Sequence, residues 1–172
     1  MTAKEIEIGF AIPVIGISAK TKWNLDDAQR DAAWNIYIEL TSRIAVSGFG
    51  HGLVREALSS YHALFVETRG ILREYGRRVA QPLAGSTVSL GYIVLWMLNG
   101  EIRPILSKWH VRLGSYESSC QPLTSAVSHE EAWPDRSDCL RDLASLENCL
   151  RHYARLFERV LEVPSMIPKQ GS

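Results

Sequence analysis

The sequence lacks a stretch that would cross a membrane. Its longest apolar run, residues 90–98, is about half of the roughly 20 residues that a spanning helix needs. The N-terminus also lacks the features of a signal peptide, because acidic residues follow Lys4 at once and no small-residue cleavage site closes the next apolar run. We therefore expect a cytoplasmic protein without a membrane span.

Cysteine is scarce and net charge is absent. The three cysteines, Cys120, Cys139 and Cys149, form no C-x-x-C pair, which fits free thiols in a reducing compartment. Nineteen basic residues balance nineteen acidic ones, so the whole chain has no attraction for DNA or an anionic membrane. A neutral protein also has little colloidal repulsion, so a protein partner or a homo-oligomer is expected.

The sequence motifs of metal, nucleotide and nucleophile chemistry are missing too. No glutamate has a histidine three residues later, as a ferritin-like di-metal site needs, and the cysteines lack the spacing of a zinc site. There is no P-loop and no G-x-S-x-G elbow. The glycine-rich residues 48–52 could cradle an anion, but an interhelix turn is the simpler interpretation. We expect no metal and no cofactor.

What the sequence does contain is helical periodicity. Apolar residues recur at three- and four-residue intervals and predict helices over residues 25–47, 52–75, 89–117 and 135–161. Four long helices with modest connections in a chain of 172 residues predict one all-α domain, an antiparallel four-helix bundle over residues 25–162. Ser128, with Glu131 three residues on, resembles a capping box before the last helix.

The third predicted helix is the centre of this bundle. Its first half is apolar on every side and must be covered all round. Pro104 removes the amide that would bond the carbonyl of Gly100, which predicts a kink near residues 99–104. Outside the bundle we expect an extended N-terminal arm over residues 1–24, lying on the bundle or on another chain, and a disordered tail over residues 163–172.

Two predicted helices carry an arginine seven residues before a histidine, Arg55 with His62 and Arg103 with His110. This spacing puts both members of a pair on one helix face. An arginine can hold a phosphate while the histidine moves protons, as RNA cleavage requires. The R-x(4-6)-H signature of HEPN ribonucleases, which are helical bundles, has this form. Solvated side chains on a helix face remain the alternative interpretation of both pairs.

The end of the central helix is a candidate surface for a partner, because tryptophan and arginine often anchor interfaces. A short connector makes this helix and the last one antiparallel neighbours, so their adjoining ends should meet, with Glu130 pairing with Lys108 or Arg112. The alternative is that Trp109 packs inward. The candidate partner-binding residues are Arg103, Lys108, Trp109, His110, His129, Glu130 and Trp133.

Three stretches, REALSSYHALFVETRGILREYG, LNGEIRPILSKWH and SHEEAWPDRSDCLRDLASLENCLRHYARLF, resemble a group of uncharacterised bacterial helical proteins. Those proteins have an LRPFLxKWHP-like stretch and an HExxW start to the last helix. The resemblance covers about residues 30–160, although Val111 stands where a proline is usual. It implies a bacterial protein that belongs to a larger machine, in conflict or anti-phage gene neighbourhoods.

These observations favour a non-catalytic protein-protein interaction subunit of a bacterial defence complex. The alternative is a HEPN-like ribonuclease toxin that uses the pairs Arg103 with His110 and Arg55 with His62, with RNA as its substrate. In that case the two pairs should converge in the folded protein.

Overall fold

A computed structural model of the protein describes residues 25–44, 53–83, 88–120 and 124–167, which are helical and contain no strand. The all-α prediction is confirmed. Seven α-helices and one π-helix occur in these ranges, in the order α1 (Asp27–Ile44), α2 (Val54–Tyr75), α3 (Arg77–Ala80), α4 (Leu90–Trp96), η1 (Met97–Ile102), α5 (Arg103–Glu117), α6 (Ala126–Glu131) and α7 (Arg136–Leu161).

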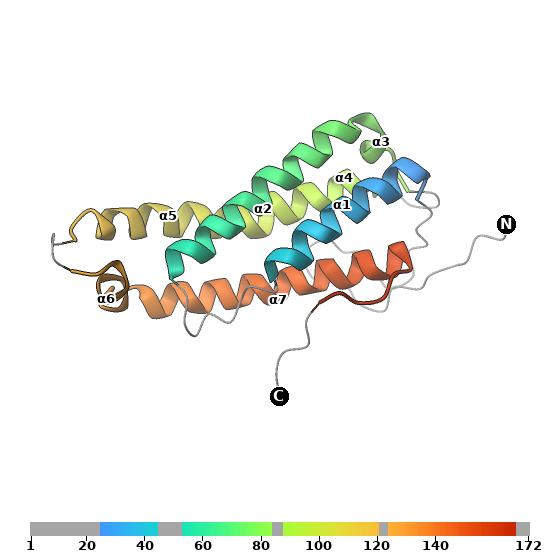
Figure 1. The fold of residues 1–172 in the computed structure, drawn as a ribbon. Helices are drawn as coiled ribbons and strands as arrows, with labels where there is room; N and C mark the ends of the chain where they lie inside the picture. The colour runs from blue at the N-terminus through green and yellow to red at the C-terminus, as the bar shows by residue number, and fades with distance from the viewer. Residues whose placement is uncertain (1–24, 45–52, 84–87, 121–123, 168–172) are drawn as a thin grey trace.

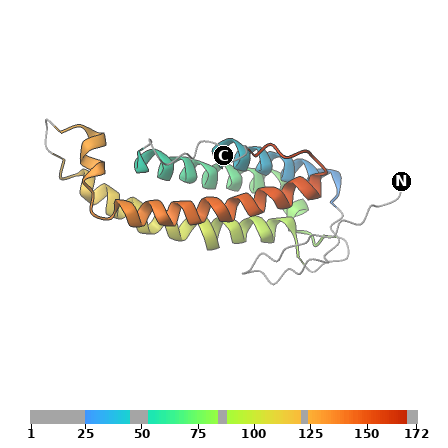
Figure 2. The same ribbon diagram turned by 90° about the horizontal axis from the view of Figure 1, so that it is seen from below.

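The long helices lie lengthwise beside one another, as Figure 1 shows for α2, α7 and the continuous column of α4, η1 and α5. α1 packs against both α2 and α7. Figure 2 shows that α6 turns across one end of the molecule, while α3 lies at the other end, beside the start of α1. The molecule therefore has two distinct ends, which differ in their candidate sites.

A single apolar core joins the helices. It includes fully buried side chains from each long helix, such as Tyr37 of α1, Leu64 of α2, Ile93 of α4 and Phe157 of α7. α7 has the strongest separation of apolar and polar faces, with buried residues at three- and four-residue intervals along its whole length. The first half of the central column is less enclosed than predicted, because Tyr92 and Leu95 are 49% and 47% exposed.

The predicted kink region contains a π-helix. The amide of Arg103 donates to the carbonyl of Leu98, five residues earlier, instead of to the carbonyl four residues earlier. Pro104 follows as one of the first residues of α5, where its missing N–H costs least. Proline therefore marks the point at which the hydrogen-bond register changes along the column.

Two short helices differ from the prediction. α3 occupies residues that the sequence predicts to be loop, because four residues make one turn and show no periodicity. The start of α6 is capped by Ser125, whose hydroxyl accepts from the Ser128 amide at 3.1 Å. The predicted capping box led by Ser128 is therefore wrong by one helical turn.

The predicted tail begins with residues that pack on the protein. The Met166 amide donates to the Tyr37 hydroxyl at 2.8 Å, and Val163 and Ile167 lie against the core. The Tyr37 hydroxyl donates in turn to Glu158 of α7 at 2.9 Å. Residues 163–167 are thus held against α1 and α7, in contrast to the predicted disorder. The predicted N-terminal arm and the glycine-rich residues 48–52 lie outside the described ranges.

Candidate functional site

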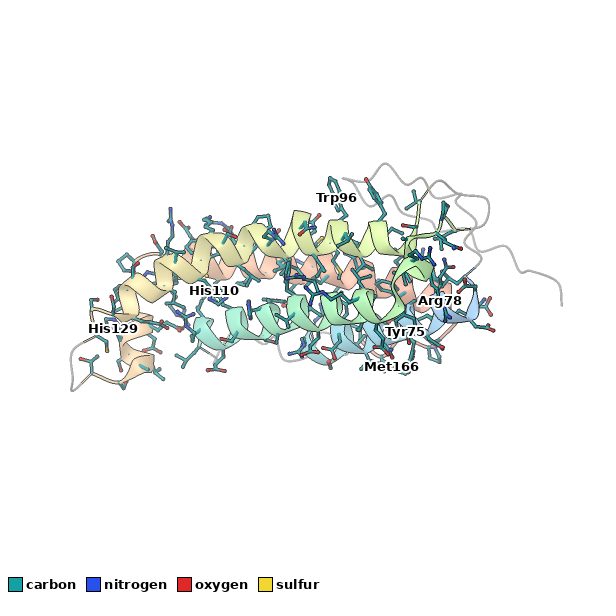
Figure 3. The ribbon with its side chains drawn as sticks, turned by 90° about the horizontal axis from the view of Figure 1, so that it is seen from above. Tyr75, Arg78, Trp96, His110, His129 and Met166 are labelled. Carbon is teal, nitrogen blue, oxygen red and sulfur yellow. The ribbon has the colours of Figure 1, made fainter. Side chains whose placement is uncertain are left out.

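Three of the four residues of the predicted Arg/His pairs meet between α2 and α5. The Arg55 Nη1 atom lies 3.1 Å from Nδ1 of His110, and the His62 and His110 rings stand edge to face with centroids 6.0 Å apart. Figure 3 shows His110 between the two helices. Since Arg55 and His62 are on α2 and His110 is on α5, only the packing of these helices creates the group.

Glu117, a residue that the sequence did not single out, completes this group. The Arg55 guanidinium donates through Nε and Nη2 to the two carboxylate oxygens of Glu117, at 2.9 and 2.5 Å. These hydrogen bonds raise the pKa of Arg55, and burial opposes them. We refer to Arg55, His62, His110 and Glu117 as the Arg/His cluster. A fork pairing of this kind fixes the guanidinium in place.

His110 is partly buried between α2 and α5, next to Arg55 and His62. Burial lowers the pKa of its imidazole, and the positive charge of Arg55 and the proximity of His62 lower it further. Nδ1 therefore accepts a hydrogen bond from Arg55, and the proton of the neutral ring sits on Nε2. Nε2 is itself buried. His110 thus has no open nitrogen, whereas His62 is exposed.

Arg103 stands apart from the Arg/His cluster. Its guanidinium carbon lies 5.3 Å from the centroid of the Phe65 ring, over which Arg69 also lies, at 5.7 Å. Arg103 precedes His110 by about two helical turns. The contacts of Phe65 with Arg103 and of Arg55 with Glu117 show that α2 and α5 run in opposite directions. The Arg/His cluster therefore contains both members of the predicted pair Arg55 and His62. Of the predicted pair Arg103 and His110, it contains only His110.

The predicted contact between the end of the central helix and the residues just before the last helix is confirmed. The Trp109 and Trp133 rings lie edge to face with centroids 5.8 Å apart, and both are buried, at 1% and 5% exposed. The Trp109 indole N–H donates to Asp142 at 3.0 Å. These rings are therefore core residues of this end of the protein, and neither is exposed to a partner.

Glu130 does not pair as predicted. Its carboxylate is 5% exposed and accepts from the backbone amides of Val54 and Arg55, at 2.6 and 3.2 Å. Leu53 at the N-cap of α2 makes no side-chain cap, so a glutamate from α6 takes that role. A carboxylate at this position also interacts favourably with the positive end of the helix dipole.

The predicted cationic partners of Glu130 pair with other carboxylates. Lys108 contacts Asp142 at 2.7 Å, and Arg112 contacts Asp135 at 3.4 Å. Lys108 and the indole of Trp109 both hydrogen-bond to Asp142, and these contacts lower the pKa of that carboxyl. His129 stacks on Tyr116 with ring centroids 4.2 Å apart, and its Nε2 lies 3.0 Å from the Tyr116 carbonyl. The candidate residues at this end therefore hold α5, α6 and α7 together.

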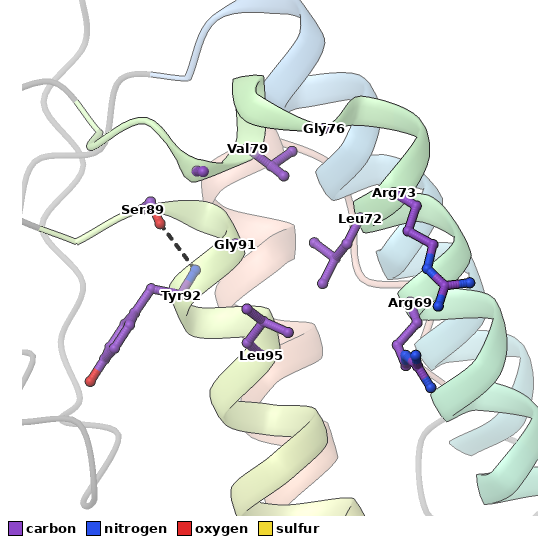
Figure 4. A pocket seen from close by; sticks show the side chains of 10 residues that line it. Arg69, Leu72, Arg73, Gly76, Val79, Ser89, Gly91, Tyr92 and Leu95 are labelled. Atoms are coloured by element: carbon purple, nitrogen blue, oxygen red, sulfur yellow. Dashed lines mark hydrogen bonds between the residues drawn. The ribbon is translucent and has the colours of Figure 1, made fainter.

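The other end of the molecule contains a cavity of about 470 Å³ between α2, α3 and α4 (Figure 4). Leu72 of α2 and Leu95 of α4 face each other across it, and Val79 of α3 closes one side. Arg69 and Arg73 stand at its rim on α2. Sequence patterns did not predict this cavity, because its lining residues come from three helices that meet only in the folded protein.

Within the described ranges, no group of three or more histidine, cysteine, aspartate or glutamate residues could hold a metal ion. None of the described helices is long and apolar enough to span a bilayer. Comparisons of the chain with models of protein families, with curated proteins and with solved structures found no match. The function has to be argued from the geometry of the chain itself.

Proposed function

We propose that the protein is a non-catalytic interaction subunit that binds an acidic surface of another protein through the exposed face of α5. The observation that carries this proposal is the composition of that face. From Arg103 to Tyr116, α5 contains no acidic residue, and its exposed residues include Arg103, Lys108 and Arg112. Val111, at 70% exposed, lies among them as an apolar contact point.

A basic face favours a different protein over a second copy of this chain. In a symmetric dimer the same patch meets itself, which would bring like charges together. The face also favours protein over nucleic acid, since Asp142 and Asp135 partly neutralise Lys108 and Arg112. The chain as a whole has no net charge to attract phosphates. An acidic protein surface with an apolar centre is complementary to these features.

The resemblance to bacterial helical proteins of conflict neighbourhoods extends this proposal. It implies that the partner is encoded beside this chain and that both belong to a defence complex in the cytoplasm. Free thiols at Cys120, Cys139 and Cys149 are compatible with a reducing compartment.

Size-exclusion chromatography with light scattering, on the chain co-expressed with the products of neighbouring genes, tests the proposal. We expect a stable complex that Arg103→Glu and Val111→Asp each disrupt. Ile38→Asp is the matched control, because Ile38 is also an exposed apolar residue, at 41%, but lies on α1. A chain that stays monomeric with every neighbour, or a complex that both α5 variants leave intact, would contradict the proposal.

The alternative function is RNA cleavage, and the convergence of Arg55, His62 and His110 favours it. Three features of the Arg/His cluster weigh against it. Glu117 occupies the guanidinium that would hold a phosphate, Nδ1 of His110 is occupied by Arg55, and Nε2 of His110 is buried. Cleavage of RNA by the wild-type chain, lost in both His62→Ala and His110→Ala, would establish the alternative in place of the interaction subunit.

We also propose that α1, α2, the column of α4, η1 and α5, and α7 form an antiparallel four-helix bundle, in which η1 is the kink of the third member. The opposite directions of α2 and α5 and the packing of α1 on α2 and α7 support this arrangement. Residual dipolar couplings measured across residues 90–117 would test the kink. We expect different axis directions before and after η1, and one common axis would contradict it.

A further inference from the structure

The cavity between α2, α3 and α4 combines apolar walls with two arginine side chains. Leu72, Val79 and Leu95 are among the residues that line it, and Leu95 is 47% exposed. Its volume of about 470 Å³ is within the range of about 300–1,000 Å³ that is typical of binding sites. Arg69 and Arg73 at the rim contact no carboxylate among the residues that the structure describes. An occupant should therefore be apolar with a negative charge at one end.

The same chain contains a segment of this composition. Residues 8–17, IGFAIPVIGI, carry no charge, and Glu5 and Glu7 precede them as the two acidic residues of the first 24. The transfer of large apolar side chains in such a segment from water to an apolar surface is favourable. The segment therefore needs an apolar surface, and the cavity is one.

The described chain begins close to the cavity. The Gln29 side chain in the first turn of α1 donates to the carbonyl of Arg78 in α3, at 3.1 Å. Val79, the next residue of α3, lines the cavity, and Leu25, the first described residue, lies four residues before Gln29. The seven residues between Ile17 and Leu25 make eight steps from one Cα atom to the next, so Ile17 can lie up to about 26 Å from Leu25 when the chain is extended.

We propose that residues 5–17 of the same chain occupy this cavity, with the apolar residues against Leu72 and Leu95 and the two glutamates near Arg69 and Arg73. Covalent linkage favours this occupant over a free ligand, because a short connection gives an effective concentration in the millimolar range. The opposite charges of segment and rim fix its direction.

Photo-cross-linking of the full-length chain tests the proposal. p-Benzoylphenylalanine at Leu95, or at Tyr92 in a second variant, should cross-link within one chain to residues 5–17, as read by mass spectrometry. The same probe at Val111, an exposed position on α5, is the control and should give no such link. Arg69→Glu with Arg73→Glu should lower the yield severalfold, and adding Glu5→Arg with Glu7→Arg should restore it.

Three results would overturn the proposal. One is a cross-link from position 95 or 92 that never reaches residues 5–17. Another is a link that forms only between isotopically labelled and unlabelled chains, since it would make a second copy the occupant. The third is a yield that the charge reversals leave unchanged, because the glutamates would then not lie near Arg69 and Arg73. None of these results depends on whether α5 binds a partner.

Discussion

Single residues connect parts of this chain that are far apart in sequence. Glu130 is 75 residues from Arg55 in the sequence. Its buried carboxylate nevertheless accepts hydrogen bonds from the backbone amides of Val54 and Arg55, and so caps α2. The first amides of α2 have no hydrogen-bond acceptor within the helix, and the Glu130 carboxylate supplies one. The same hydrogen bonds hold α6 against α2. The neighbouring Glu131 is exposed. The two adjacent glutamates therefore have very different importance for stability.

We predict that Glu130→Ala lowers the free energy of unfolding by about 1–3 kcal/mol, the usual cost of leaving buried hydrogen-bonding groups without a partner. Glu130→Gln should cost less, because it keeps one acceptor oxygen. Glu131→Ala is the matched control and should change stability by no more than about 0.5 kcal/mol. Urea denaturation followed by circular dichroism measures all three. Equal losses for positions 130 and 131 would contradict the capping role.

His110 makes stability depend on pH. Its pKa in the folded protein is lowered from the ordinary value of 6.5, mainly by burial and then by Arg55. The unfolded chain therefore binds more protons in the window just below that value. The stability that comes from a neutral His110 is fully present above about pH 6.5 and is lost as the pH falls through the folded pKa.

We predict that His110→Asn makes stability less dependent on pH between about pH 7 and about pH 5, because an amide oxygen can accept the hydrogen bond from Arg55 without titrating. Denaturation at a series of pH values measures this slope. His152→Asn is the control, since His152 is exposed on α7. A slope as steep in His110→Asn as in the wild type would show that other groups cause the pH dependence.

At the scale of the helix, the six residues of η1 connect α4 and α5 so that the apolar residues of both helices face the core. A π-helical turn contains about one residue more than an α-helical turn. Met97, Leu98 and Ile102 of η1 remain buried, while Asn99 and Gly100 are exposed. The extra residue is thus accommodated on the outer side of the column.

We predict that deletion of Asn99 converts η1 to α-helix and leaves stability within about 1 kcal/mol of the wild type. Deletion of Ser107, an exposed residue of α5, is the control. It should turn each later α5 residue by about 100° and expose Trp109 and Leu113 to water. That change should cost at least about 3–5 kcal/mol. Thermal melts of the two deletion variants measure their stability. Similar losses of stability in both variants would mean that η1 contains no extra residue that can be removed without moving the residues of α5.

Periodicity predicted the long helices because their buried faces repeat along the chain, as in α2 and α7. It could not predict α3, which is a single turn, nor the π-helical register of Met97–Ile102, which the spacing of apolar residues does not specify. The Arg/His cluster was predicted only as two separate spacings. Its assembly depends on the antiparallel placement of α2 and α5, and Glu117 joins it through tertiary contacts that no local pattern encodes.

For the molecule as a whole, the core is one connected cluster that takes buried residues from every long helix. Trp109 of α5, Leu143 of α7 and Leu58 of α2 belong to it. We expect a single core of this kind to unfold as one cooperative unit. Cys139 on α7 is 0% exposed, and burial raises the pKa of its thiol to about 12, with Asp142 adding to the effect. It therefore reports on global opening.

We predict that Cys139 reacts with a thiol reagent only when the whole protein unfolds, since the reactive thiolate is both buried and disfavoured in the folded state. The variant Cys120→Ser with Cys149→Ser leaves Cys139 as the one thiol of the chain. In a urea series, the midpoint of Cys139 labelling should coincide with the midpoints of circular dichroism and tryptophan fluorescence. A matching variant that keeps Cys120 alone should label at lower urea, because Cys120 is half-buried beyond the end of α5. Labelling of Cys139 well before the loss of helix would mean that α7 opens separately from the rest of the core, and that this molecule contains more than one folding unit.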